Sequence, residues 1–376
     1  MDEVLLAERL IAYDTSRRAG LGLATDFVAG WLEARGAEVE RVTPIGGRRC
    51  LLARVGSGPA RLILHGHLDV VPGHPEQFVP RREGGRLFGR GAYDMKAALA
   101  AMMLAVADLR AGLRGAEVLL VVVPDEERTA PGENCTEAMV REGLRGDFVV
   151  CGEPTDLQVG VQAKGVLILR IEVRGTAAHG STPWLGENAV LGAVELFHRI
   201  GELPFARESA SLFARPSINL GRIQGGDAVN KVPDCCVMDI DIRYLPGQRH
   251  EEVLRQVRSI AADAAVSVLI ERPPAIVPPD HPYVLTLLET VGRHEPSAAS
   301  VGRDGASDAV AFLGVGVPAV EFGPRGAGHH GPDEHVEIGS LGLYRRTLAE
   351  LARTVAQRAS AGGAGADSPA GAAAST

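Results

Sequence analysis

The chain has 376 residues, 45% of them hydrophobic and 23% charged, which gives enough apolar material for a substantial core and enough length for two domains. Its formal net charge of −8 argues against a nucleic-acid partner, because such partners require clustered lysine and arginine against the phosphate backbone. There is no run of about 18 apolar residues of the kind that spans a bilayer, so we expect no membrane partner either.

Two features favour the cytoplasm. The N-terminal sequence MDEVLLAERL is acidic and amphipathic, unlike the basic and then apolar layout of a secretion signal. The five cysteines contain no Cys-x-x-Cys pair and their number is odd, which is typical of buried thiols in a reducing compartment. We therefore predict a cytoplasmic protein without a thiolate zinc site.

The first part of the chain alternates apolar strands with helical patterns. Residues 62–64 and 118–123 are short, continuous and rich in branched side chains, which indicates strands covered on both faces. Residues 95–109 carry alanine, methionine and leucine with few helix breakers, which predicts a buried helix. This order predicts an α/β sandwich with a largely parallel sheet, whose functional residues lie at the carboxyl ends of its strands.

The pattern changes near residue 164. Strict alternation of apolar and polar residues over 237–244 predicts a sheet with only one covered face. Further elements of this segment are expected at residues 166–173 (strand), 188–200 (helix), 217–223 (strand), 251–265 (helix) and 266–271 (strand). We predict a smaller α+β domain over 164–274, inserted into a catalytic domain made of 1–163 and 275–358. Residues 359–376, mostly Ala, Gly and Ser without a period, are predicted to be a disordered tail.

Acidic residues and histidines gather where apolar runs end, at His67 with Asp69, Asp94, Asp125 to Glu127, Glu153, and His329 with His330. Burying so many carboxylates together is costly without a compensating cation. Two divalent ions would supply that charge, and the mixture of carboxylates and imidazoles suits zinc, with cobalt or manganese as alternatives. The pattern therefore predicts a two-metal hydrolytic site.

Each group has a simpler interpretation when taken alone. His67 and Asp69 could stabilise a turn, Asp94 could cap the following helix, and the other groups could lie in solvated loops. The Gly-Arg-Gly sequence at residues 89–91 lacks the rest of a dinucleotide-binding fingerprint. The metal hypothesis depends on the conjunction of all five groups.

The chain also carries a series of motifs, in the order HGHLDVVPG, GRGAYDMK, PDEERTAPG, CGEPT, RGTAAHGSTPWLGENAV, NKVPD, DIRYLPG, GASDAVAF and HHGPDEHV. In this order they resemble peptidase family M20, in its acetylornithine deacetylase and succinyl-diaminopimelate desuccinylase group, over nearly the whole chain except the tail. The resemblance implies a zinc-peptidase-like α/β sandwich as catalytic domain. It also implies a ferredoxin-like α+β insert that acts as a lid and dimerisation domain in a homodimer.

The resemblance implies five metal ligands. Asp94 would bridge two ions, and the peptide bond after it would be cis. His67 and Glu153 would bind one ion, while Glu127 and His330 would bind the other.

The two adjacent histidines are not equivalent in this pattern. The family spacing His-x-x-Asp/Asn-Glu is met by His330 with Asp333 and Glu334. His329 does not meet it, and we interpret this residue as part of the loop or as a neighbour of the ligands.

Three residues match catalytic positions of the family. Glu126 would be the general base that takes a proton from a metal-bridging water and passes it to the leaving amine. Asp69 would hydrogen-bond the second ring nitrogen of His67 and fix its tautomer. His179 would steady the oxyanion, reaching across a dimer.

Three further residues match positions that contact substrate. Arg243 would hold a substrate carboxylate with its planar guanidinium, although it could also be a surface arginine on an alternating strand. Asn230 and Ser307 match other pocket positions. A Ser-Asp-His hydrolase built on Ser307 is disfavoured, because no Gly-x-Ser-x-Gly elbow surrounds it.

We therefore predict a dinuclear metal-dependent hydrolase that cleaves the amide bond of an N-acyl amino acid, as a deacetylase or desuccinylase does. The alternative is a metallo di- or carboxypeptidase acting on short peptides. A non-catalytic metal-binding protein on the same scaffold is disfavoured, because Glu126 and all five ligands are present.

Overall fold

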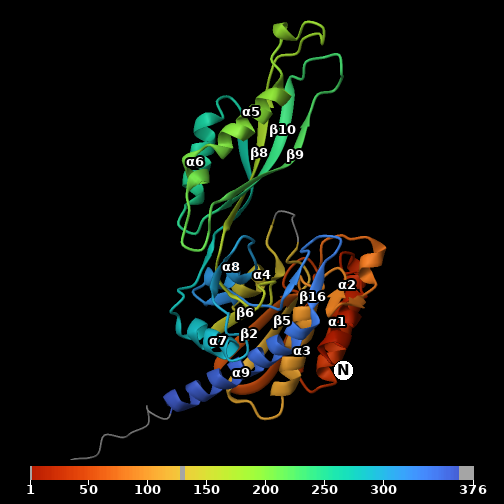
Figure 1. The fold of residues 1–376 in the computed structure, drawn as a ribbon, viewed down its shortest axis with the longest axis vertical. Helices are drawn as coiled ribbons and strands as arrows, with labels where there is room; N and C mark the ends of the chain where they lie inside the picture. Colours follow the sequence, from red (N-terminus) through yellow and green to blue (C-terminus); the bar gives the residue numbers. More distant parts are fainter. Residues whose placement is uncertain (1, 128–131, 364–376) are drawn as a thin grey trace, which may run out of the picture. The chain divides into compact units, whose positions relative to one another are not determined.

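The computed structural model describes residues 2–127 and 132–363 (Figure 1). The chain forms two compact units. Unit 1 consists of Met1–Gly160, Val277–Ser300 and Ser307–Thr376, and unit 2 of Val161–Ile276 and Val301–Ala306. Their roles as catalytic and dimerisation domains remain predictions.

Unit 1 contains most of the secondary structure. Its helices are α1 (Glu3–Ile11), α2 (Arg18–Glu33), η1 (Pro75–Phe78), α3 (Lys96–Leu109), α4 (Cys135–Arg141), α7 (Pro282–Gly292), α8 (Ala309–Leu313) and α9 (Ile338–Gly363). Its strands are β1 (Glu38–Val42), β2 (Cys50–His67), β3 (Arg81–Glu83), β4 (Arg86–Phe88), β5 (Arg114–Val123), β6 (Phe148–Cys151), β14 (Ala319–Glu321), β15 (Gly326–Ala327) and β16 (His335–Glu337). Strands β7 (Val159–Ala163), β12 (Ala275–Ile276) and β13 (Ser300–Arg303) lie where the chain passes from one unit to the other.

The main sheet of unit 1 is parallel at its centre, as predicted. The second half of β2 pairs in parallel with β5 and with β6, and β6 pairs in parallel with β14. The first half of β2 was not predicted, because Gly56 and Gly58 interrupt its apolar pattern. Val122 of β5 partners both Leu51 and Gly66, so the two halves of β2 lie on opposite sides of β5. Because the second half of β2 and strands β5, β6 and β14 run in parallel, their carboxyl ends lie at one edge of the sheet.

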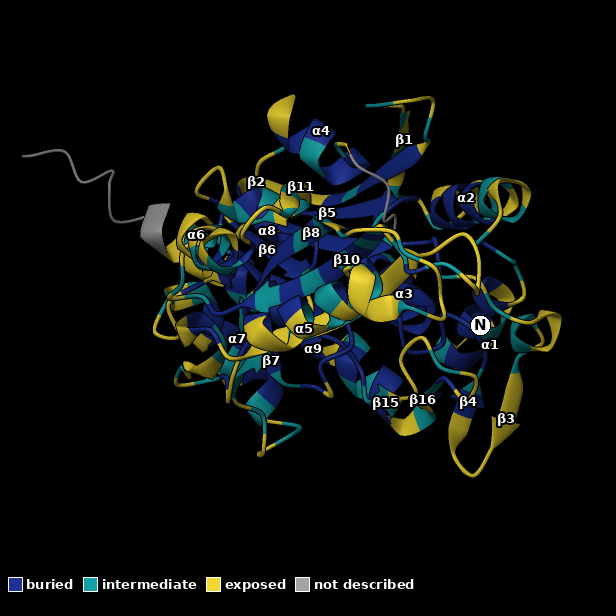
Figure 2. Cartoon of the chain, turned by 90° about the horizontal axis from the view of Figure 1, so that it is seen from above, coloured by how far each residue is buried: buried dark blue, intermediate teal, exposed yellow. Residues whose placement is uncertain are grey.

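Helices cover this sheet on both faces. Helices α3 and α9 pack against β2 and β5, and α1 packs on α3. Helices α4 and α8 contribute Cys135, Met139 and Phe312 to a buried cluster with side chains of β2, β5 and β6. Figure 2 shows the central strands as buried. This arrangement confirms the predicted α/β sandwich.

A small second sheet in unit 1 has the strand order β15-β16-β4-β3. The loop between β15 and β16 contains both His329 and His330. Because β16 pairs with β4, this loop is held against the segment that leads from β4 into α3. The backbone N–H of Gly89 donates to the carbonyl of Glu334 at 3.0 Å, which fixes the contact.

Helix α9 continues through Gly363, five residues into the segment predicted as a tail. Alanine is the strongest helix former, and Ala359 and Ala361 favour this extension of the helix. The rest of the predicted tail, 364–376, lies outside the described residues. No helix in the described ranges combines the length and the apolar character that crossing a membrane requires.

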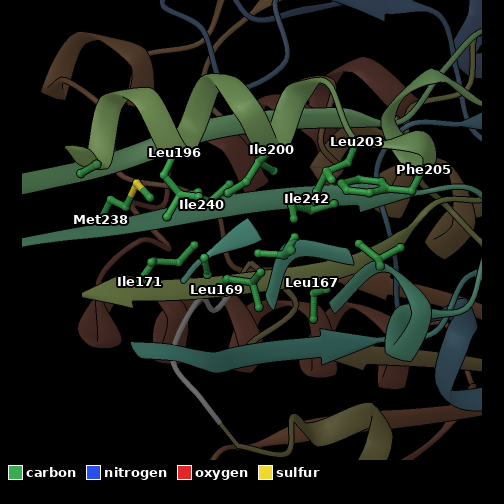
Figure 3. Close-up of a cluster of buried hydrophobic side chains, with 14 of the residues drawn as sticks. Leu167, Leu169, Ile171, Leu196, Ile200, Leu203, Phe205, Met238, Ile240 and Ile242 are labelled. Atoms are coloured by element: carbon green, nitrogen blue, oxygen red, sulfur yellow. The ribbon is translucent and has the colours of Figure 1, made fainter. Parts of the chain in front are cut away.

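Unit 2 has an antiparallel sheet in the order β11-β8-β10-β9. Its elements are β8 (Gly165–Arg174), η2 (Pro183–Leu185), α5 (Ala189–Gly201), η3 (Pro204–Arg207), β9 (Ser217–Gly225), β10 (Cys235–Tyr244), α6 (His250–Ile260) and β11 (Ala265–Arg272). Every second residue of β10 is buried, as the alternation predicted. Figure 3 shows α5 packed on these side chains, including Leu196 and Ile200 over Met238, Ile240 and Ile242. The α+β character of this segment is confirmed.

One boundary in unit 2 was predicted wrongly. The helix expected over 251–265 ends at Ile260, and β11 already begins at Ala265. Ala262 adopts a positive φ of 48°, a left-handed conformation that ends a helix.

Candidate metal and active site

The candidate site lies at the carboxyl ends of the parallel strands of unit 1. His67 is the last residue of β2, Glu126 and Glu127 follow β5, and Glu153 follows β6. Asp94 precedes α3, and His330 comes from the loop between β15 and β16. Sheet edges of this kind gather functional side chains from segments far apart in sequence. The structure thus brings all six of these predicted residues into unit 1.

Asp94 is the centre of the cluster, and its two carboxylate oxygens face different histidines. The distance from Oδ1 to His67 Nε2 is 3.0 Å, and the distance from Oδ2 to His330 Nε2 is 3.2 Å. The carboxylate is buried. This geometry is compatible with a carboxylate that bridges two ions.

Two further carboxylates complete two candidate sets of ligands. Glu127 Oε1 lies 2.9 Å from His330 Nε2, and Glu153 Oε1 lies 4.0 Å from His67 Nε2. One set is therefore His67, Glu153 and Asp94 Oδ1, and the other is His330, Glu127 and Asp94 Oδ2.

The donor set fits divalent metal ions. Ligands at about 2.0–2.2 Å from one tetrahedral ion lie about 3.3–3.6 Å apart, which is within the spread of the distances above. His67, Asp94 and Glu127 also offer donor atoms that all lie within 4.8 Å of one another. In addition, Oε1 of Glu153 is buried and has no hydrogen-bond partner among the described residues. A buried carboxylate oxygen without a partner is costly, and a cation would satisfy it.

His329, although it lies in the loop between β15 and β16, contacts the cluster directly. Its Nε2 is 2.5 Å from Asp94 Oδ2, and it forms a candidate metal-holding group together with Asp94 and His330. His330 has a φ of 59°, a left-handed conformation that is uncommon outside glycine. This turn of the backbone lets two adjacent imidazoles face the same carboxylate oxygen. Of the two, only His330 is also within hydrogen-bond distance of Glu127.

Asp69 contacts the cluster in a different way from the one predicted. His67 Nδ1 lies 2.9 Å from the backbone carbonyl oxygen of Asp69, whereas its distance to the carboxylate Oδ1 is 3.6 Å. The carboxylate instead accepts hydrogen bonds from the backbone N–H groups of Glu126 and Glu127, at 3.2 and 2.9 Å. The short turn after His67 brings the carbonyl to the ring, which frees the side chain to hold the next loop. Asp69 therefore positions both His67 and the two glutamates.

The charges of the cluster perturb one another. Burial raises the pKa of Glu126 well above its usual range, and the neighbouring carboxylate of Glu153 adds to the shift. Burial likewise raises the pKa of Glu153, with the charge of Asp94 adding to it. Without a cation these carboxylates favour their protonated forms, and a bound metal ion would favour the charged form of Glu153, the one of the two that would hold it.

Two residues that hold Asp94 were missed by the sequence analysis. Glu334 is buried, and its Oε1 accepts hydrogen bonds from the backbone N–H groups of Tyr93 and Asp94, at 3.0 and 3.2 Å. Its Oε2 pairs at 2.6 Å with Nη1 of Arg90, which is also buried. The peptide bond from Asp94 to Met95 is cis, as the resemblance implied. Arg90 belongs to the motif GRGAYDMK and Glu334 to HHGPDEHV, but nothing in their spacing indicates that they pair.

A second buried network lies behind His67. Asp308 accepts hydrogen bonds from Asn134 Nδ2 at 2.6 Å and Thr136 Oγ1 at 2.5 Å. His65 Nε2 lies 2.9 Å from the same threonine oxygen, and burial lowers the pKa of His65 to about 4. Ser307 is buried beside this network, and its Oγ accepts from the N–H of Ala309 at 3.3 Å. In this structure, Asp308 ties the start of α4 to β2.

The remaining predicted site residues lie in unit 2. His179 is exposed, its Nδ1 lies 2.7 Å from Ser181 Oγ, and its backbone bridges to Lys231. Asn230 is adjacent, because its carbonyl accepts from the N–H of Gly180 at 2.7 Å. Arg243 lies near the other end of β10, where it pairs with Asp241 at 2.8 Å.

Comparison with known proteins agrees with this geometry. Residues 63–354 match Peptidase family M20/M25/M40. Acetylornithine deacetylase of Edwardsiella ictaluri is 30% identical over 358 residues, which cover 88% of this chain and 90% of that protein. Acetylornithine deacetylase of Proteus mirabilis is 29% identical over 352 residues, which cover 87% and 88% of the two chains.

Solved structures share the fold. An M20 family metallo-carboxypeptidase from Sulfolobus solfataricus has a TM-score of 0.77 at 17% identity, and the match covers 95% of this chain and 100% of that one. A tripeptidase from Staphylococcus aureus has a TM-score of 0.76 at 19% identity, and the match covers 94% and 98%. The family match, the two-unit α/β fold and the candidate metal ligands agree: the chain belongs to peptidase family M20/M25/M40 and is a metal-dependent amidohydrolase.

Proposed function

We propose that this protein hydrolyses the amide bond of an N-acyl amino acid, releasing a carboxylate and a free amine. One observation carries the proposal: a buried cluster that fits two cations stands beside Glu126, in a chain 30% identical over most of its length to an acetylornithine deacetylase. The solved peptidases are less than 20% identical and support the fold alone.

Five residues would hold two divalent ions in this site. His67 and Glu153 would bind one, Glu127 and His330 the other, and Asp94 both. Zinc is our first choice, with cobalt or manganese as alternatives, because the ligands are imidazoles and carboxylates without thiolates. When bound, the ions would supply Lewis acidity towards the amide carbonyl and towards water.

Glu126 would carry the proton. It takes a proton from the attacking water and delivers it to the amine nitrogen as the amide bond breaks. The hydrogen bond from its N–H to Asp69 fixes the start of the loop that carries it, at 3.2 Å. A carboxyl whose pKa is raised by burial can hold that proton between the two steps.

Residues of unit 2 would bind the substrate. Arg243 would exchange its ion pair with Asp241 for the carboxylate of the amino acid, and Asn230 would contribute to the pocket. His179 would donate a hydrogen bond to the oxyanion that forms from the carbonyl. In unit 1, Ser307, which is buried beside Asp308, would contribute to the substrate pocket.

We place His179 in the site of a partner subunit. Within one chain, His179 lies beside the start of β10 and Arg243 near its end, which separates them by roughly 25 Å at about 3.3 Å per residue. One small substrate cannot contact both residues of the same chain. The exposed edge strand β9 of unit 2 offers a surface for pairing two copies.

A substrate panel tests the reaction. N-acetyl and N-succinyl amino acids should be hydrolysed in the presence of zinc or cobalt, and unmodified dipeptides should not. Replacing Glu126→Gln should leave metal content intact and lower kcat by roughly 10²–10⁴, whereas the exposed control Glu142→Gln should behave as the wild type. Hydrolysis of dipeptides alone would favour the peptidase alternative, and near-normal turnover of Glu126→Gln would refute the role of Glu126.

Subunit mixing tests the dimer. Glu126→Gln and His179→Ala should each be inactive, but an equal mixture should recover up to about a quarter of wild-type activity, because half of the dimers are mixed and each contains one intact site. No recovery in a mixture shown to exchange subunits would place His179 in its own chain's site. We also propose a cytoplasmic location, which is supported by five cysteines that are all free thiols.

A further inference from the structure

A tight turn follows shortly after Glu153 in unit 1. The N–H of Gln158 donates to the carbonyl of Thr155 at 2.9 Å, which closes a β-turn. The two central residues of this turn, Asp156 and Leu157, have φ values of 56° and 65°. A turn with a positive φ at both central positions favours glycine, asparagine and aspartate. Leucine is therefore an unusual residue at this position.

The surrounding structure holds this turn against the preference of leucine. Leu157 is buried, and its N–H donates to the carbonyl of Gly323 at 2.8 Å. The hydroxyl of Thr155 accepts from the N–H of the same glycine at 2.9 Å. Backbone conformations that side chains rarely adopt persist only where neighbouring contacts impose them, and they gather at functional sites. The turn therefore suggests a function for the other residue that it presents, Asp156.

The side chain of Asp156 contacts two other segments of the candidate site. Its Oδ1 accepts a hydrogen bond from the hydroxyl of Tyr93 at 2.7 Å and another from the backbone N–H of Gly326 at 3.1 Å. Tyr93 directly precedes Asp94. Gly326 is the first residue of β15, which leads into the loop between β15 and β16. One carboxylate thus connects the segments that carry three candidate ligands: Glu153, Asp94 and His330.

The ring of Tyr93 is itself held on several sides. Tyr93 is 7% exposed, and its backbone N–H donates to Glu334 at 3.0 Å. A Cβ added to Gly326 would lie 2.4 Å from the ring, so the ring packs directly on the backbone of β15. The ring also lies edge-on to the imidazole of His329, with the ring centroids 6.4 Å apart. The hydroxyl of Tyr93 therefore meets Asp156 from a fixed direction.

We propose that Tyr93 and Asp156 form a positioning pair that sets the distance between the two candidate metal positions. Glu153 is a proposed ligand of one ion and His330 of the other, and the pair connects both of their segments to that of the shared ligand Asp94. Loss of a residue that orients metal ligands lowers metal affinity by about 10–100-fold. Asp156 is exposed, so we expect an effect near the lower end of this range. The inference rests on the proposed ligand set and does not depend on the substrate.

Two substitutions of Asp156 separate the role of its carboxylate from that of the turn. Asp156→Gly accommodates the positive φ but removes the acceptor, whereas Asp156→Asn accommodates the same φ and keeps an acceptor oxygen. Competition with a chelator should show that Asp156→Gly binds its weaker zinc ion about tenfold less tightly than the wild type does. Asp156→Asn should bind it nearly as the wild type does. Urea midpoints are measured in parallel and should stay close to that of the wild type, because the side chain is exposed.

A tyrosine substitution tests the other half of the pair. Tyr93→Phe removes the hydroxyl, keeps the ring, and should weaken zinc binding as well. Because Tyr93→Phe and Asp156→Gly break the same hydrogen bond, Tyr93→Phe should add little when it is combined with Asp156→Gly. The matched control is Tyr283→Phe, which removes the hydroxyl of a half-buried tyrosine in α7 that is stacked on Phe148. It should bind zinc as the wild type does. Additive losses in the double variant would show that the two residues do not act as a pair.

Cobalt reports the geometry of the site without turnover. The visible absorption of bound Co²⁺ depends on the number and arrangement of its ligands. Asp156→Gly and Tyr93→Phe should change this spectrum, whereas Asp156→Asn should leave it unchanged. Wild-type zinc affinity and an unchanged cobalt spectrum in Asp156→Gly would overturn the inference. Equal losses in Asp156→Gly and Asp156→Asn would assign the effect to the charge of Asp156 and would also overturn it.

These measurements fail separately from the proposed function. If the pair controls metal affinity but no N-acyl amino acid is hydrolysed, the positioning role stands and the proposed function fails. If N-acyl amino acids are hydrolysed while Asp156→Gly binds metal as the wild type does, the inference alone fails. A wild-type protein that binds neither zinc nor cobalt would overturn the ligand set and this inference with it.

Discussion

Removing Glu334 should destabilise unit 1 and loosen the candidate metal site together. Its side chain is 1% exposed and pairs with Arg90, which is 4% exposed. Loss of one partner of such a pair costs about 3–5 kcal/mol, because the other charge stays buried without compensation. Glu334→Ala also removes the acceptor of the N–H groups of Tyr93 and Asp94. We therefore expect a loss of about 3–5 kcal/mol in the free energy of unfolding.

Urea unfolding measures this loss, with Trp31 as a buried fluorescent reporter in unit 1. Glu334→Gln should cost less than Glu334→Ala, because an amide oxygen can still accept from the two backbone N–H groups. The double variant Arg90→Met, Glu334→Leu should recover much of the stability, since no charge is then left buried alone. Glu33→Ala, which breaks an exposed ion pair with Arg41, is the control and should leave the midpoint unchanged.

The same variants should separate stability from metal binding. The double variant restores charge balance but not the acceptor that holds the backbone of Asp94. Its affinity for zinc should therefore stay weaker than that of the wild type even when its stability is largely recovered. If Glu334→Ala unfolds at the wild-type midpoint, or if the double variant is no more stable than Glu334→Ala, Arg90 and Glu334 do not stabilise unit 1 as a buried ion pair.

Three further predictions concern other parts of unit 1. Burial lowers the pKa of Lys96 from 10.5 to about 7, so between these pH values the folded state binds fewer protons than the unfolded state and the stability of the wild type rises with pH. Lys96→Met should therefore be more stable than the wild type near pH 6. In urea unfolding at several pH values, the advantage of the variant should shrink towards pH 10. Gly323→Ala would place a Cβ 2.2 Å from the carbonyl oxygen of Glu153, which should cost about 1–3 kcal/mol and weaken metal binding; wild-type zinc affinity would contradict this reasoning. Removing metal with a chelator should lower the melting temperature, and restoring an ion to 100 times its Kd should return about 2.7 kcal/mol per site; a melting temperature that ignores both treatments would exclude a metal bound to the folded state.

The sequence predicted the cluster because strand ends are local signals. His67, Glu126 and Glu153 each follow a short apolar run, and the edge of a parallel sheet brings such ends together whatever the details of packing. Alternation in β10 was equally local, and it predicted which residues are buried. Helix α6 was predicted too long because a single alanine with a positive φ ends it, and alanine gives no warning of that conformation.

The contacts that support the cluster were not predictable in this way. Arg90 and Glu334 are separated by 244 residues, and their pairing depends on β16 lying beside β4. The hydrogen bond from His67 to the carbonyl of Asp69, rather than to its carboxylate, depends on the exact path of two residues of backbone. Sequence spacing predicts which residue types reach the site. Backbone geometry determines whether the carbonyl or the side chain of Asp69 accepts the hydrogen bond from His67.

The charge balance of the site connects its architecture with the proposed proton transfer. Charged groups around the cluster are compensated in different ways: Arg90 pairs with Glu334, whereas Asp308 accepts hydrogen bonds from Asn134 and Thr136. Five carboxylates lie at or beside the candidate metal positions: Asp69, Asp94, Glu126, Glu127 and Glu153. Two divalent ions would leave one negative charge, and a single proton would remove it. Two of these carboxylates, Asp69 and Glu126, lie outside the candidate ligand set, and burial raises the pKa of both. The carboxylate of Asp69 accepts hydrogen bonds from two backbone N–H groups, which favour its charged form. Glu126, the residue proposed to shuttle the proton, is therefore the one whose protonation would make the group neutral.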